Sequence, residues 1–326
     1  MQSTPAPIGR RAAERTVCLV TAAFERMPAR LAYGLADALL PALVAWGVAH
    51  ELRAGRAGRG ARRNLRIVFR DSLGSLGAWR LLARQGRHLA HLAVDVCRMP
   101  RLDAARIGRH FDLDSLAPLR ALLAEGRGLL CVSAHLGPWE ILGHAASVSG
   151  LPVTVVVRGL GSRPLDRALA RLRTSGGQRC LPQRGALLAL RKVLARGEIA
   201  GLLLDEDERR TPLFTPFLGT LAATSPAAAF LQRVSGAPIA VVSCERTACE
   251  HFRLRVWRVV RPPATADREA ALRSVTAEIN HALGDAILDR PDQWLWGSRR
   301  FATRPPGETA GPDGLPPPAG GTAADR

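Results

Sequence analysis

The chain has very little lysine, tyrosine or aromatic side chain of any kind. Lys192 is its single lysine and Tyr33 its single tyrosine, and Phe, Trp and Tyr make up 5% of the 326 residues. Schiff-base chemistry or a P-loop would therefore depend on Lys192 alone, and no glycine-rich phosphate loop precedes it. With so few aromatic residues and no recognisable binding motif, we expect no nucleic-acid partner.

Motifs for several common mechanisms are also missing. The sequence has no G-x-S-x-G nucleophile elbow, which argues against a serine hydrolase. Its six cysteines form no C-x-x-C pair and show no metal-ligand spacing, so they fit reduced thiols better than a disulfide framework. We expect neither a metal nor a cofactor.

Acidic residues are scarce beside basic ones. There are 46 Lys and Arg against 28 Asp and Glu, a formal net charge of +18, and nearly all of the positive charge is arginine. A compositional bias toward arginine can produce this excess by itself. The functional alternative is a surface that meets anionic lipid, an acidic carrier protein or another polyanion.

Long uncharged hydrophobic runs are absent near the N-terminus. The segment 31–49, LAYGLADALLPALVAWGVA, is almost long enough to cross a bilayer, but it contains Asp37 and Pro41. Both a span and an interfacial helix remain open, and the interfacial helix is favoured. Arginines then recur every three or four residues, at Arg53, Arg56, Arg59, Arg63, Arg66 and Arg70. On one side of a helix they can face solvent or anionic headgroups.

From residue 116 onward the pattern alternates between helices and short apolar strands. The strands expected are 128–134, 151–157, 199–205 and 237–245, with 252–260 as an edge strand. Continuous apolar strands separated by helices predict an α/β fold with a mostly parallel central sheet covered by helices. The expected regions are an N-terminal lead (1–27), an apolar helix with the basic stripe (28–72), the α/β domain (73–304) and a disordered tail (305–326).

The stretch SAHLGPWE carries the first candidate chemistry. His135 follows the strand 128–134, and Glu140 comes five residues later. On one continuous helix the two would point about 140° apart, but they can meet if His135 lies in a loop. A carboxylate on Nδ1 would leave Nε2 free to take a proton from a hydroxyl. Such a pair, without a protein nucleophile, suits direct acyl transfer to an alcohol, although H-x-x-x-x-E alone is often accidental.

Other strand ends supply further candidates. Asp205 ends the strand 199–205 and is expected to point into a cleft, whereas the acidic residues 206–208 fit a solvated turn, a helix start or a metal site. Arg158 directly follows the strand 151–157, and Arg171 and Arg173 lie on the next predicted helix. Guanidinium groups there can hold phosphate or carbonyl oxygen, or can simply be surface charges.

The order of these elements resembles the late acyltransferases of lipid A biosynthesis, the lauroyl/myristoyl transferase family, which includes phosphatidylinositol mannoside acyltransferases. The resemblance covers residues 28–306 and implies a glycerolipid acyltransferase-like fold with a membrane-associated N-terminal helix. It rests on six segments in order: RRNLRIVF, AHLGPWE, RLRTSGG, GEIAGLLLDED, FTPFLGTLAATSPAAAFLQRVSGAPI and QWLWGSRRFATRP.

This resemblance implies roles for particular residues. His135 would be the general base and Glu140 its orienting partner, without metal. The donor would be acyl carrier protein or acyl-coenzyme A, and the acceptor a hydroxyl of a membrane glycolipid, at the cytoplasmic face of the inner membrane. The chain departs from the family at Ala134 and Pro138, where asparagine is common, so lipid A precursors and other glycolipids both remain candidate acceptors. The resemblance further places Asp205 and either Arg171 or Arg173 in the site, with Phe217, Gly219 and Thr224 shaping the same cleft, while Arg158 is a candidate substrate-binding residue from its strand-end position alone.

Two rival readings use the same residues differently. A metal-dependent hydrolase would employ His135 with Asp205 and Asp207, and would need a divalent ion. A basic membrane-binding protein without catalysis would be supported by charge alone. Neither explains the ordered set of motifs, so acyl transfer is the favoured function.

Overall fold

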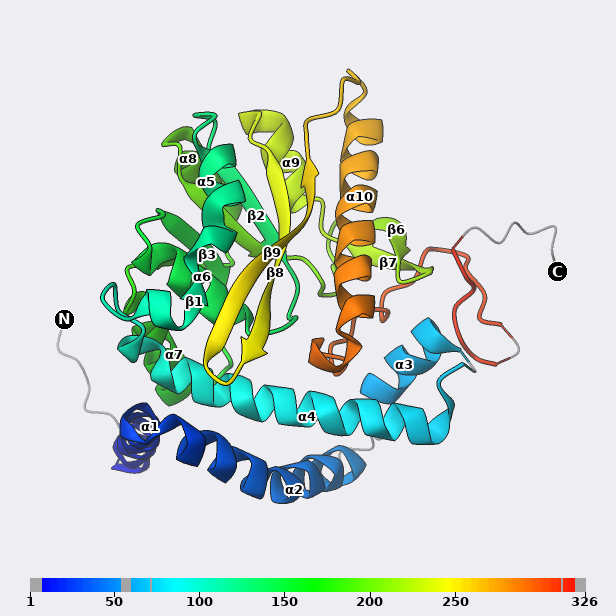
Figure 1. Cartoon of the computed structure of the whole chain (residues 1–326). Coiled ribbons are helices and arrows are strands. Elements are labelled where there is room, and N and C mark those ends of the chain that lie inside the picture. The colour runs from blue at the N-terminus through cyan, green and yellow to red at the C-terminus, as the bar shows by residue number, and fades with distance from the viewer. Residues whose placement is uncertain (1–7, 54–59, 71, 312, 320–326) are drawn as a thin grey trace.

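The computed structural model describes residues 8–53, 60–70, 72–311 and 313–319 (Figure 1). The side chains of residues 8–14 and 42–53 are not described. Of the predicted basic stripe, Arg56 and Arg59 therefore lie outside the described residues, as does the side chain of Arg53.

A twisted sheet forms the centre of the described chain, with the strand order β1-β9-β8-β2-β5-β3-β4. All neighbouring strands run parallel except β8 and β9, which are antiparallel. The expected mostly parallel sheet is confirmed. The bounds are β1 Phe111–Asp112, β2 Leu129–Ser133, β3 Val153–Val157, β4 Arg179–Pro182, β5 Ile199–Leu203, β8 Ile239–Ala248 and β9 His251–Val260.

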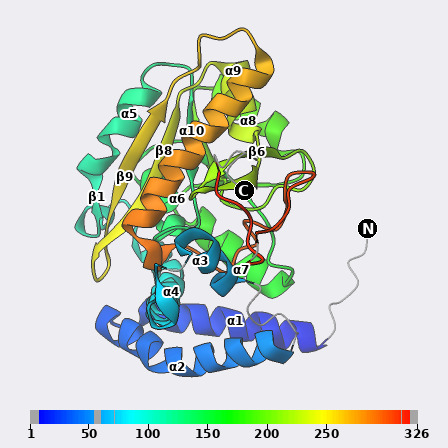
Figure 2. The ribbon, with the colours of Figure 1, turned by 90° about the vertical axis from the view of Figure 1, so that its right-hand side faces the viewer.

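Helices cover both faces of this sheet because alternate residues of the central strands point to opposite sides. Ile239 and Val241 of β8 join a core beneath α8, α9 and α10, whereas Ala240 and Val242 join a second core beneath α5 and α6. Figures 1 and 2 show α10 and α5 on opposite sides of the sheet. The bounds are α5 Ala117–Leu123, α6 Trp139–Val148, α7 Arg163–Thr174, α8 Ala186–Ala195, α9 Ala227–Ser235 and α10 Arg268–Asp289.

Four helices precede the sheet and lie along one end of it (Figure 1). They are α1 Ile8–Arg26, α2 Ala29–Arg53, α3 Ala61–Phe69 and α4 Gly74–Arg98. Helices α1 and α2 both pack on α4, which lies between them and most of the sheet, and α1 also packs on α7.

For the segment 31–49, which lies in α2, one of the two expectations was that it crosses a membrane. Among the residues described, none of the helices is long and apolar enough to do so. Helix α2 instead docks on α4 through polar contacts. Asp37 binds Arg87 and His91 of α4, and the hydroxyl of Tyr33 donates to the buried Asp95.

Three further features differ from the sequence expectations. The strand β9 is not at the edge of the sheet, because the two-residue β1 pairs outside it. The short strand β4 and an antiparallel hairpin, β6 (Leu213–Phe217) with β7 (Thr220–Thr224), had no clear sequence signal. The described part of the segment expected to be disordered packs on the protein: Leu315 is buried and the Ala319 amide donates to Gly219.

Candidate active site

The loop after β2 brings His135 beside the end of β5. Ser133 of β2 pairs with Leu203 of β5 in parallel register, so the residues two positions further on, His135 and Asp205, emerge side by side. Pro138 caps α6 at its N-terminus, and Gly137 has φ +63°, which turns the chain sharply between the strand and the helix. The position of His135 thus follows from strand register and a tight turn.

Asp205 engages His135 through both carboxylate oxygens. Its Oδ1 lies 2.9 Å from His135 Nδ1, and its Oδ2 accepts the His135 backbone N–H at 2.9 Å and the Trp294 indole N–H at 2.7 Å. Because an ionised carboxylate only accepts hydrogen bonds, Nδ1 carries the proton and Nε2 of the neutral ring is left with a free lone pair. This is the tautomer that a general base requires.

Charge coupling shifts the pKa values of both groups. Burial by itself would lower the pKa of His135, but the charge of Asp205 and its hydrogen bond raise that pKa above the ordinary imidazole value. Burial likewise would raise the pKa of Asp205, and the adjacent imidazole and the donated N–H groups hold it below its usual range. Asp205 therefore stays ionised although it is completely buried.

Glu140 does not orient His135, contrary to the pairing expected from the sequence. It lies in the first turn of α6, where its Oε2 accepts a hydrogen bond from Arg173 Nε at 2.8 Å and its Oε1 binds the same guanidinium. The two side chains are 12% and 16% exposed. The physical reason is that the first turn of α6 faces α7, which carries Arg173, so the carboxylate satisfies that cation. Its charge still contributes, as a lesser cause, to the raised pKa of His135.

The contact with Glu140 distinguishes Arg173 from the other candidate, Arg171. Arg173 lines a pocket, whereas Arg171, two residues earlier on α7, is exposed. The sequence alone left open which of the two matters.

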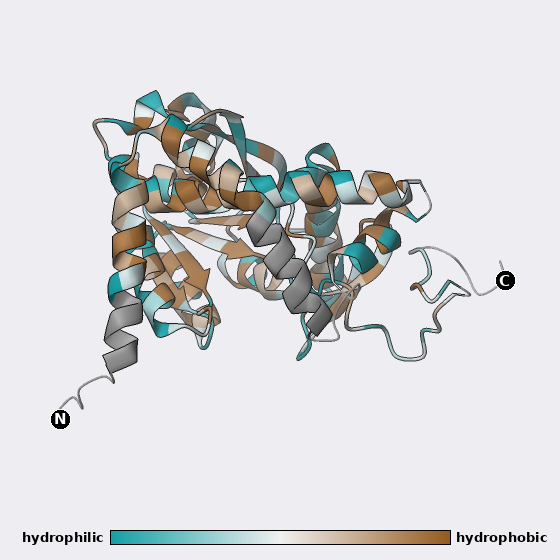
Figure 3. Cartoon of the chain, turned by 90° about the horizontal axis from the view of Figure 1, so that it is seen from below, coloured by the Kyte–Doolittle hydropathy of each residue, from teal (hydrophilic) through white to brown (hydrophobic). Residues whose placement is uncertain are grey.

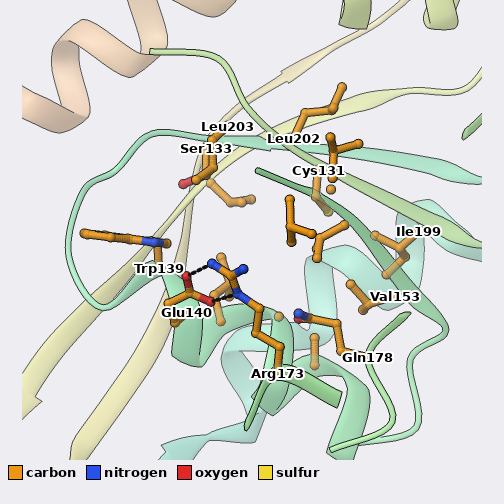
Figure 4. A pocket seen from close by; sticks show the side chains of 18 of the residues that line it. Cys131, Ser133, Trp139, Glu140, Val153, Arg173, Gln178, Ile199, Leu202 and Leu203 are labelled. Carbon is orange, nitrogen blue, oxygen red and sulfur yellow. Dashed lines mark hydrogen bonds and ion pairs between the residues drawn. The ribbon is translucent and has the colours of Figure 1, made fainter. Parts of the chain in front are cut away.

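An apolar pocket lies between the sheet and helices α6 and α7, with the Glu140–Arg173 pair in its wall (Figure 4). It encloses about 740 Å³ of space, the open mouth included. His135 does not line it, but the His135 ring packs edge-on against Trp139, which does, with 5.3 Å between centroids. Its other lining residues include Leu119, Cys131, Ser133, Leu142, Gly143, Ala146, Val153, Val155, Val156, Val157, Gln178, Ile199, Gly201, Leu202, Leu203 and Val242.

The remaining sequence candidates lie elsewhere. Arg158 is exposed and forms an ion pair with Glu206, 2.7 Å between Nη2 and Oε1. Phe217 and Thr224 are buried in the hairpin β6–β7, and Gly219 forms its turn. None of these four residues lines the pocket, although the Phe217 ring contacts Trp294, 5.8 Å between centroids.

Two residues that the sequence did not identify as candidates, Trp294 and Arg300, complete the site. Trp294 belongs to the segment QWLWGSRRF, whose tryptophans were noted only as a motif, yet it bonds directly to Asp205. The buried Arg300 from the same segment donates to the carbonyls of Glu206 and Ala223, which fixes the chain just after Asp205. The motif itself could be recognised in the sequence, but no spacing rule predicts that residue 294 contacts residue 205.

The acidic residues that follow Asp205 form no hydrogen bond with His135. Asp207 accepts hydrogen bonds from the backbone and hydroxyl of Thr303, at 3.0 and 2.9 Å. Within the described ranges, no group of three or more His, Cys, Asp and Glu side chains is arranged to hold a metal ion. The metal-hydrolase reading required Asp207 beside His135, and the geometry places it elsewhere.

The turn at Gly137 makes a specific prediction. An added Cβ would lie 2.1 Å from the Cys244 carbonyl oxygen, on top of the cost of a positive φ. We expect Gly137→Ala to lower the free energy of unfolding by roughly 2 kcal/mol and to displace His135. Gly150→Ala is the matched control, since φ is +85° there but a Cβ would meet nothing within 4 Å. Thermal unfolding of both variants checks this, and an equal loss in the two would contradict it.

The chain shares sequence with known acyltransferases. A family model described as bacterial lipid A biosynthesis acyltransferase matches residues 16–303. The chain is 27% identical over 255 residues to the lipid A biosynthesis palmitoleoyltransferase of Escherichia coli (strain K12), a match covering 77% of this chain and 80% of that protein.

Two other relatives match a smaller part of this chain. The lipid A biosynthesis lauroyltransferase of Escherichia coli (strain K12) is 26% identical over 212 residues, 62% of this chain and 65% of that protein. The phosphatidylinositol mannoside acyltransferase of Mycolicibacterium smegmatis (strain ATCC 700084 / mc(2)155) is 27% identical over 151 residues, 45% of this chain and 50% of that protein. Since the family model spans most of the chain, this acyltransferase belongs to the bacterial lipid A biosynthesis acyltransferase family.

Proposed function

We propose that this acyltransferase moves a fatty acyl chain from a thioester of acyl carrier protein or coenzyme A to a hydroxyl of a glycolipid such as a lipid A precursor, with His135 as general base. The observation that carries the proposal is the His135–Asp205 pair beside an apolar pocket. The names of the relatives, two lipid A biosynthesis acyltransferases and a phosphatidylinositol mannoside acyltransferase, support acyl transfer to a glycolipid as the reaction class.

The pair supports a direct transfer. Nε2 of His135 takes the proton of the acceptor hydroxyl as its oxygen attacks the thioester carbonyl carbon. The tetrahedral intermediate then expels the thiolate, which receives the proton from the imidazolium and leaves as thiol, while the new ester remains on the acceptor. Arg173, in the pocket wall, offers N–H donors for the carbonyl oxygen as negative charge develops on it.

The apolar pocket fits the hydrocarbon part of the donor. Its lining is mostly aliphatic, and Trp139 connects it to the His135 ring. Burial of an acyl chain there would be driven by the hydrophobic effect, about 0.8 kcal/mol per methylene. The depth of the pocket would then set which chain length is preferred.

Helices α1 and α2 present a surface suited to the cytoplasmic face of the inner membrane. Their exposed apolar side chains include Leu19 and Leu31, 71% and 59% exposed, together with Leu39. Figure 3 looks at this side and shows apolar and polar residues mixed along the described parts of both helices. Apolar side chains among arginines favour contact with anionic headgroups, as the net charge of +18 does.

The direct test uses the purified full-length protein. Thioesters of acyl carrier protein and of coenzyme A, in several chain lengths, are offered with a lipid A precursor, a phosphatidylinositol mannoside or no acceptor. Mass spectrometry of the lipids is expected to show a new ester with wild type and none above background with His135→Gln. Equal transfer by His135→Gln would overturn the general base, and thioester hydrolysis without acceptor acylation would overturn the transferase.

The raised pKa of His135 makes a pH prediction. A general base works only when neutral, so kcat/KM should rise with pH through the pKa of His135 in the free enzyme. Because Asp205 raises this pKa, the midpoint of the acid limb should lie above the reference value of 6.5. Initial rates from about pH 5 to pH 9 measure this limb. A midpoint below the reference value would show that Asp205 does not control the base.

A further inference from the structure

We propose that Trp294 is a positioning residue that holds the Asp205 carboxylate in the orientation that selects the Nδ1–H tautomer of His135. The inference rests on the proposed function of His135 and adds a residue to it. It starts from one contact, in which the Trp294 indole N–H donates to Asp205 Oδ2 at 2.7 Å. Both side chains are fully buried, so water cannot replace this donor.

The hydrogen bonds divide the carboxylate into two halves. Oδ1 faces the His135 ring, and Oδ2 receives the His135 backbone N–H and the Trp294 N–H. Two donors on Oδ2 oppose rotation of the carboxylate about its Cβ–Cγ bond, and that rotation would turn Oδ1 away from Nδ1. Without Trp294, one backbone donor alone would hold Oδ2, and a buried charge would lose one of its partners.

The backbone around Trp294 also clamps the loop that carries His135. Leu136 and Trp294 form an antiparallel bridge, the Gly137 N–H donates to the Gln293 carbonyl at 3.2 Å, and the Leu295 N–H donates to the His135 carbonyl at 3.0 Å. The indole ring is fixed in turn by the Phe217 ring, 5.8 Å away between centroids. It also touches the Trp296 ring edge-on at 4.7 Å, and phenylalanine at position 296 would keep an aromatic ring at that contact. The donor to Asp205 is therefore held on both its backbone and its ring.

Trp296 offers a matched control. It is as buried as Trp294, sits two residues away in the same segment, and its indole N–H also donates, at 2.6 Å, but to the Pro291 carbonyl. Replacing either tryptophan by phenylalanine removes one indole N–H from the same core. Only Trp294→Phe removes a donor from Asp205, so a purely structural effect should appear in both variants.

The experiment combines kinetics with a readout that needs no activity. We expect Trp294→Phe to lower kcat roughly 10- to 100-fold with little change in KM, and Trp296→Phe to stay within about 3-fold of wild type. In protein labelled with ¹⁵N-histidine and assigned with His135→Gln, the ring of wild-type His135 should show the Nδ1–H tautomer. Trp294→Phe should add the Nε2–H tautomer, and Trp296→Phe should not.

A third measurement requires no substitution at either tryptophan. In wild-type protein the indole ¹⁵N–¹H signal of Trp294 should shift with the titration of His135, and that shift should vanish in His135→Gln, whereas the Trp296 signal should be insensitive. Equal kinetic losses in both phenylalanine variants, an unchanged tautomer in Trp294→Phe, or a Trp294 signal that ignores His135 would each overturn the positioning role. A wild type that shows these signals but transfers no acyl group would overturn the proposed function instead.

Discussion

Asp205→Asn is expected to lower kcat for acyl transfer about 10²- to 10⁴-fold, as much as the loss of His135 itself. The carboxylate accepts three N–H donors, from the His135 ring, the His135 backbone and Trp294. An asparagine has one acceptor oxygen, so its NH₂ group must face at least one of these donors. If it faces Nδ1, the ring takes the Nε2–H tautomer and can no longer accept a proton from the acceptor.

The comparison with Glu140→Gln shows which carboxylate serves the base. Asp205→Asn should move the acid limb of the kcat/KM profile to lower pH, because the largest influence raising the pKa of His135 is lost. Glu140→Gln should move that limb less, since Glu140 acts on His135 only through its more distant charge. The opposite order of shifts would restore Glu140 as the orienting partner and refute the assignment to Asp205.

Arg173→Met is expected to destabilise the protein by roughly 3 kcal/mol, because it leaves the Glu140 carboxylate without its partner in the wall of an apolar pocket. A lone charge there is costly, whereas removal of both charges is tolerated better. The double variant Arg173→Met/Glu140→Gln should therefore recover about half of the loss or more.

Thermal unfolding of the two single variants and the double variant completes a double-mutant cycle. A coupling near zero would mean that the pair is solvated and that the pocket is more open than its lining indicates. A matched surface pair is Arg158 with Glu206, 64% and 40% exposed. Removing that pair should cost no more than about 1 kcal/mol.

Much of the architecture could be predicted from the order of residues. Apolar runs such as GLLCV and IAGLLL are long enough for strands and too short for buried helices. The structure confirms these two predicted strands as β2 and β5. Since parallel strands end at one edge of a sheet, His135 and Asp205 were both recognisable as residues at that edge. Two of the six motifs that carry the family resemblance, AHLGPWE and GEIAGLLLDED, lie at these strand ends.

Which side chains meet at that edge was decided by the tertiary structure. Glu140 is near His135 in sequence, but the register of β2 and β5 places Asp205 beside the imidazole. Because α6 faces α7, Glu140 instead forms its ion pair with Arg173. Trp294 reaches Asp205 from 89 residues away. Local patterns determine which elements form, because helix and strand periodicities are short-range. The partners within the site depend on register and packing between distant segments, which no local pattern specifies.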